Sequence, residues 1–141
     1  MPIEVRNVQK RPVDAEAMAA IAALALEAGG GDQNADLSIA LVDDAHIRRL
    51  NAQFLGRDRP TDVMAFPAGD EESLGEVVVS VQRAEQQARE LERSLSEELT
   101  ELVAHGVLHL LGLGDQDEPS RRRMAELQAR VLARARRDGL I

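Results

Sequence analysis

Cysteine, tryptophan and tyrosine are absent from this 141-residue sequence, and its two aromatic side chains are both phenylalanine. The lack of cysteine excludes disulfides, thiolate nucleophiles and cysteine-bound zinc. No apolar run approaches the roughly 20 residues of a membrane-spanning helix, and the first residues do not have the apolar stretch of a signal peptide. We therefore expect a cytoplasmic protein without membrane association, whose core consists of aliphatic side chains.

The charge of the chain is unevenly distributed. The formal net charge of −8 argues against a general nucleic-acid binder. Between residues 70 and 118, thirteen acidic side chains accompany three arginines, whereas residues 119–141 carry seven arginines and two acidic residues. An acidic middle followed by a basic end leaves room for a local basic surface.

Apolar periodicity predicts a mixture of strands and helices. Alternating or β-branched runs predict four strands, at residues 3–8, 37–42, 63–66 and 76–81. Helical spacing predicts five helices. The first begins after Asp14 and the second after Asp43 or Asp44, and the other three cover residues 82–93, 96–111 and 119–137, with Ser96 as the N-cap of the fourth helix. The expected fold class is α+β: one compact domain over residues 1–141, in which a mixed sheet of about four strands packs with about five helices.

The fourth expected helix carries a pattern typical of a metal site. His105 and His109 are four residues apart, so both imidazoles lie on one helix face, one turn from each other. Gly112 can reverse the chain and bring Asp115 back towards them. Apart from its second position and its last ligand, the pattern H-x-x-x-H-x-x-G-x-x-D has the spacing of the metzincin zinc motif. We predict one Zn²⁺, or another transition metal, bound by His105, His109 and Asp115 on a zincin-like helix, with Asp117 as the alternative third ligand.

Two simpler interpretations accompany this prediction. The two histidines can lie by chance on a polar helix face, with Gly112 serving only as a helix end. Glu98 and Glu101, on the histidine face, can orient the imidazoles or can be solvated charges.

The position after the first histidine has no catalytic side chain. Zincin proteases place a glutamate there as general base, and this sequence has Gly106. A peptidase mechanism of that type is therefore disfavoured. We expect metal-bound water to be the nucleophile, with no protein base assigned.

Three blocks of the sequence are distinctive: HGVLHLLG at residues 105–112, LN at residues 50–51 followed by PTDVMAFP at residues 60–67, and LGEVVVS at residues 74–80. Together they resemble the YbeY family of bacterial rRNA-maturation endoribonucleases. The blocks occur in family order and cover nearly the whole chain. The resemblance implies a zinc-dependent endoribonuclease specific for single-stranded RNA, acting in 16S rRNA 3′ end maturation and ribosome quality control. It also implies single-stranded rRNA, the small ribosomal subunit or assembly factors as partners.

The sequence departs from the family pattern at positions near the expected site. Asp115 stands where the third histidine ligand usually stands, and Leu55 stands where many members carry an arginine believed to meet the RNA phosphate. Arg57 and Arg59 are close by and can take that role, or can be solvated loop residues.

Two other functions therefore remain open. One is a non-catalytic, metal-stabilised ribosome-assembly factor that docks through Phe54 and the basic last helix. The other is a hydrolase of a different substrate, including peptides, against which Gly106 counts.

Overall fold

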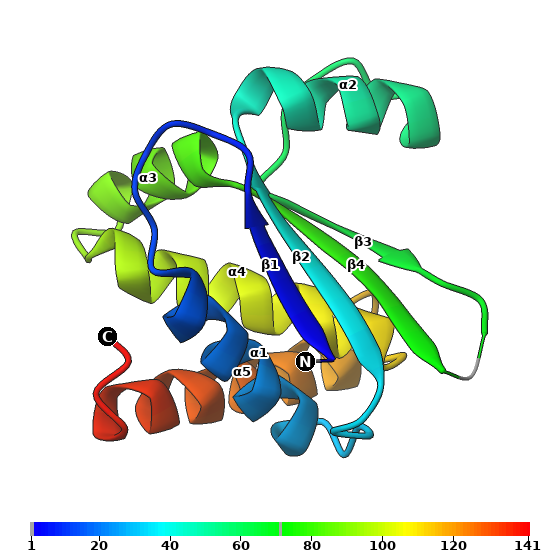
Figure 1. Cartoon of the computed structure of the whole chain (residues 1–141), viewed down its shortest axis with the longest axis vertical. Helices are drawn as coiled ribbons and strands as arrows, with labels where there is room; N and C mark the ends of the chain where they lie inside the picture. Colours follow the sequence, from blue (N-terminus) through cyan, green and yellow to red (C-terminus); the bar gives the residue numbers. More distant parts are fainter. Residues whose placement is uncertain (1, 71) are drawn as a thin grey trace.

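The computed structural model describes residues 2–70 and 72–141. Within these residues the chain forms four strands and five helices (Figure 1). In chain order they are β1 (Ile3–Asn7), α1 (Ala15–Ala28), β2 (Asp36–Val42), α2 (Asp44–Leu55), β3 (Val63–Pro67), β4 (Ser73–Ser80), α3 (Val81–Glu90), α4 (Leu95–Leu110) and α5 (Glu118–Arg137). The expected α+β class is confirmed.

The strands form one mixed sheet in the order β1-β2-β4-β3. β1, β2 and β4 are parallel, and β3 pairs antiparallel with β4 as an edge strand. The β-branched run at Val77, Val78 and Val79 is almost fully buried because β4 has a strand on each side and a helix on each face. This arrangement leaves β3 at the edge of the sheet, in contact with α4.

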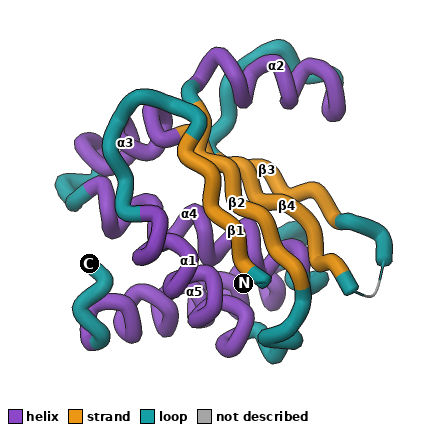
Figure 2. Tube along the Cα trace, in the orientation of Figure 1, coloured by secondary structure: helices purple, strands orange, loops and turns teal. Residues whose placement is uncertain are grey.

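The helices cover the two faces of the sheet unequally (Figure 2). Leu37, Ile39, Leu41, Val77 and Val79 point to the side of α1, α3, α4 and α5 and form the main core with them. Ala40, Val42 and Val78, which alternate with them, point to the other side and pack with Ile47 of α2. None of the helices in the described part of the chain is long and apolar enough to cross a membrane.

Side-chain caps define where the helices begin. Asp14 accepts a hydrogen bond from the Ala17 amide at 3.1 Å, and Asp43, rather than Asp44, caps α2 by accepting one from the His46 amide at 2.8 Å. The expected cap Ser96 is wrong: Ser94 is the N-cap of α4. Ser94 and Glu97 satisfy each other's backbone amides in a capping box, and Ser96 already lies inside the helix.

Candidate metal centre and groove

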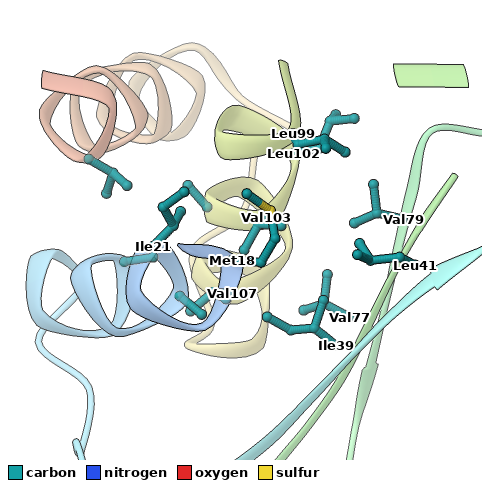
Figure 3. Packing of buried hydrophobic residues seen from close by; sticks show 14 of the residues in the cluster. Met18, Ile21, Ile39, Leu41, Val77, Val79, Leu99, Leu102, Val103 and Val107 are labelled. Atoms are coloured by element: carbon teal, nitrogen blue, oxygen red, sulfur yellow. The ribbon is translucent and has the colours of Figure 1, made fainter. Parts of the chain in front are cut away.

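The helix α4 holds both histidines on a firmly packed support. Leu99, Val103 and Val107 lie on its buried face and pack against α1 and the sheet (Figure 3). His105 and His109 remain partly accessible, with 24% and 31% of their side chains exposed. Because the opposite face of the helix is locked into the core, the two imidazoles are presented at fixed positions.

A sharp reversal after α4 brings Asp115 back to the histidines, as the sequence predicts. Gly112 has φ +92°, a left-handed conformation that glycine adopts without strain, and its amide donates to the His109 carbonyl at 2.9 Å. Asp115 Oδ2 then lies 3.6 Å from His105 Nε2 and 3.5 Å from His109 Nε2, and the two Nε2 atoms are 2.9 Å apart.

These separations fit one metal ion. A tetrahedral ion with ligand distances of about 2.0–2.1 Å requires ligand atoms that are about 3.3–3.4 Å apart. The observed separation of 2.9 Å is shorter than this distance, and those of 3.5 and 3.6 Å are slightly longer. Two imidazole nitrogens and one carboxylate oxygen are also a donor set that suits a catalytic transition metal. The three residues can therefore hold a metal ion.

Asp117 has a different role from the one considered for it. Its carboxylate accepts a hydrogen bond from the Ser120 amide at 2.8 Å and caps α5. The hydrogen bond from Ser120 lowers the pKa of Asp117 below its usual value. An Asp117 engaged in this way stabilises the start of α5, which leaves Asp115 as the carboxylate of the site.

The partner of His105 is Gln128, which sequence reasoning missed. His105 Nδ1 is 3.3 Å from Gln128 Oε1, while Gln128 Nε2 donates to the Glu101 carbonyl at 3.3 Å. Since the amide nitrogen is engaged by that carbonyl, the amide oxygen faces the ring and accepts a hydrogen bond from the Nδ1–H group. The Nε2 lone pair of His105 is thereby directed towards His109 and Asp115, where the three residues could hold a metal ion.

Glu98 and Glu101 do not contact the histidines. Both carboxylates pair with Arg93, which lies 3.0 Å from Glu101, and Glu98 is almost completely buried. The hydrogen bond to Glu101 is the main reason why the pKa of Arg93 is raised. These acids therefore fasten the start of α4 and are neither imidazole partners nor free solvated charges.

An open groove of about 1030 Å³ begins at the histidines and runs between α4, β3 and the loop after α2. His105 and His109 line one part of it, and Phe54, Leu55, Arg57 and Arg59 line another. The structure therefore brings the two candidate phosphate-binding arginines to the same groove as the two candidate metal-binding histidines.

Arg57 and Arg59 present free guanidinium groups on a fixed loop. Neither has a salt bridge within the described residues, and both are exposed. Asp58, between them, pairs instead with Arg48 at 2.8 Å, and this contact lowers the pKa of Asp58. The loop itself is held by Asn51, which is 3% exposed and whose Nδ2 donates to the Arg59 carbonyl at 2.9 Å.

The one carboxylate among the described residues that line the groove, that of Asp62, accepts hydrogen bonds on both oxygens. Asp62 Oδ1 accepts a hydrogen bond from the Val63 amide at 2.8 Å, and Oδ2 accepts one from Gln87 at 3.3 Å. Gly106 also lines the groove, and a Cβ atom at this position would lie 2.5 Å from Val77 Cγ1. Close packing of α4 on the sheet thus explains the glycine that stands where zincin proteases carry their general base.

The fold and these residues together define a small α+β protein with a zincin-like site that can hold a metal ion. Comparison with known proteins identifies the family. The family model described as "Endoribonuclease YbeY" matches residues 4–136. Proteins of that name from Pelotomaculum thermopropionicum and Aquifex aeolicus are 42% and 39% identical, over 95% and 94% of this chain and 97% and 87% of theirs.

A solved structure shares the fold. The solution structure of a Thermotoga maritima protein matches with a TM-score of 0.67 and 28% identity, and the match covers 98% of this chain and 94% of that one. The chain belongs to the YbeY family, and the resemblance seen in its sequence is confirmed.

Proposed function

We propose that residues 1–141 act as one metallo-endoribonuclease domain that cleaves single-stranded rRNA with Zn²⁺ held by His105, His109 and Asp115. The observation that carries the proposal is the shared groove. The groove is lined by two imidazoles, which converge with the carboxylate of Asp115. The same groove is lined by two exposed arginines that have no salt bridge among the described residues. A metal site beside a phosphate-binding site is the arrangement that phosphodiester hydrolysis requires.

Each side chain has a specific task in this reaction. Arg57 and Arg59 bind the substrate phosphate through guanidinium forks. Gln128 keeps the proton of His105 on Nδ1, and Asp115 supplies the negative ligand. A divalent ion held by His105, His109 and Asp115 would supply a Lewis acid and would lower the pKa of bound water.

No general base is assigned among the described side chains that line the groove. Asp62 is the one acidic residue among the described side chains that line the groove, and its two oxygens already accept hydrogen bonds from Val63 and Gln87. Activation of water therefore depends on the metal, and activity should follow metal occupancy.

The biological part of the proposal follows from family membership. The relatives are named as endoribonucleases, and we assign this chain to 16S rRNA 3′ end maturation and ribosome quality control. Its partners would be single-stranded rRNA and the small ribosomal subunit or its assembly factors. With such substrates the protein would act in the cytoplasm.

Cleavage of RNA by zinc-loaded protein tests the proposal. An unpaired RNA should be cut and the same sequence in a duplex should not, and His109→Ala should abolish both cleavage and zinc retention measured by mass spectrometry. Equal cleavage by the unaltered protein and His109→Ala would reveal a contaminating nuclease and contradict the proposal. Bound zinc and bound RNA without cleavage would favour the alternative, a non-catalytic metal-stabilised ribosome-assembly factor, for which the exposed Phe54 and Leu55 offer a docking surface.

A further inference from the structure

The two aromatic residues of the chain lie together in the groove. Phenylalanine occurs twice in 141 residues, with no tryptophan or tyrosine, and both Phe54 and Phe66 line the groove that contains His105 and His109. Their ring centroids are 5.2 Å apart at an interplanar angle of 67°, an edge-to-face contact. Aromatic side chains are thus concentrated at the proposed reaction site.

The rings differ in how they are held. Phe66 is half-buried in β3 and packs against the small core beneath α2. Phe54 comes from the last turn of α2 and is 56% exposed, although exposure of a ring this large is unfavourable in water. The inner ring therefore supports an outer ring that has free surface for a ligand.

The charge beside the rings favours a nucleotide as that ligand. Arg57 and Arg59 follow Phe54 in the sequence and line the same groove, and their guanidinium groups have no acidic partner among the described residues. The nearby acids are engaged, Asp58 with Arg48 and Asp62 with Val63 and Gln87. An aromatic surface next to free cations matches a base with its attached phosphate.

We propose that Phe54, supported by Phe66, is a stacking subsite for one unpaired base next to the phosphate held by Arg57 or Arg59. This inference rests on the proposed endoribonuclease function and deepens it. A base in a duplex is stacked between its neighbours and cannot lie on the ring, so the subsite selects unpaired RNA. It also fixes which phosphate of the strand reaches the histidines.

The absence of tryptophan and tyrosine makes the subsite measurable by fluorescence. A short single-stranded RNA with one 2-aminopurine is mixed rapidly with excess zinc-loaded protein, and binding and quenching are recorded before cleavage proceeds. The 2-aminopurine is moved along the strand, and one position should show strong quenching. Phe54→Leu should remove that quenching and weaken RNA binding about tenfold or more, while Phe54→Trp should retain the affinity.

A comparison with abasic RNA isolates the ring–base contact. Loss of the base at the quenched position should weaken binding by the unaltered protein, and Phe54→Leu should weaken binding of the abasic RNA little further. Leu91→Ala is the matched control, because Leu91 is 60% exposed and does not line the groove. It should leave RNA binding unchanged.

The other outcomes each overturn a distinct statement. Unchanged RNA binding and quenching by Phe54→Leu would overturn the subsite, as would equal weakening for intact and abasic RNA. Unchanged RNA binding together with lost binding of a ribosomal protein would assign Phe54 to a protein interface instead. Base-dependent binding without any cleavage would overturn the endoribonuclease function while keeping the subsite, and absence of RNA binding by the unaltered protein would overturn both.

Discussion

Substitution of Gly106 by alanine tests the reasoning about how α4 is held on the sheet. The added Cβ would lie 2.5 Å from Val77 Cγ1, 3.1 Å from Val77 Cγ2 and 3.3 Å from Val63 Cγ2. Val77 is fully buried on β4 and cannot turn into solvent. Overpacking of this kind costs about 1–3 kcal/mol, and alanine recovers about 1 kcal/mol of helix propensity over glycine. We expect a net loss of about 1 kcal/mol of unfolding free energy.

The sign of this effect should reverse when Val77 is made smaller. In a Val77→Ala background the contacts with both Cγ atoms are gone, so Gly106→Ala should gain its helix propensity and become stabilising by up to about 1 kcal/mol. Urea unfolding of the two single variants and the double variant measures this coupling. Gly114→Ala is the control, because no atom lies within 4 Å of a Cβ placed there. Equal destabilisation by Gly106→Ala in both backgrounds would refute the packing explanation.

Three further results are expected. Gln128→Met should raise the zinc dissociation constant about 10–100-fold in a chelator competition assay, while Gln128→Glu, which keeps an acceptor, should lose less; unchanged affinity in Gln128→Met would contradict the orienting role. Asp115→Ala should weaken zinc binding strongly in the same assay and Asp115→His should restore it, whereas full affinity in Asp115→Ala would require another third ligand. The backbone amide of Ser94, and after it Arg136, lowers the pKa of Glu97 to about 2. Since this value is below the roughly 4.3 of an unfolded chain, the contribution of Glu97 to stability is present above that pH and is lost as the pH falls towards 2. The free energy of unfolding, measured with urea, should therefore differ less between pH 7 and pH 3 in Glu97→Gln than in the unaltered protein. An identical difference in the two proteins would contradict this role of Glu97.

Local patterns in the sequence predict the elements well because their signals are local. The β-branched run before Ser80 and the apolar run before Val42 mark strands that are buried on both faces. The wrong choice of Ser96 as N-cap could have been avoided from the sequence. Ser94 is followed three residues later by Glu97, which is the spacing of a capping box, whereas Ser96 is followed by Leu99. The strand order β1-β2-β4-β3 depends on contacts between distant segments and could not be predicted in this way.

In the candidate site, too, local spacing predicts some residues, whereas others are revealed only by the packing of distant segments. His105, His109 and Gly112 belong to one helix and its terminal turn, so spacing alone predicts that their side chains and Asp115 converge. Gln128 reaches His105 from α5, and only the packing of α5 on α4 reveals it. One signal was present: Gln128 stands directly beside Leu127 on the buried side of that helix. Glu98 and Glu101 were correctly placed on a face of α4, but helix geometry does not show that Arg93 would occupy that face.

The loop after α2 explains how the proposed phosphate-binding site can form although leucine stands at position 55. At its start, the Asn51 carbonyl accepts a hydrogen bond from the Arg57 amide at 3.2 Å, and the Asn51 side chain donates one to the Arg59 carbonyl. At its end, the Asp62 carbonyl accepts the Ser80 amide at 2.9 Å, which fastens the loop to the end of β4. The backbone is therefore ordered before substrate arrives, and binding a phosphate restricts only the arginine side chains. Two guanidinium groups on a preordered loop in the same groove can replace one supplied from the end of the helix itself.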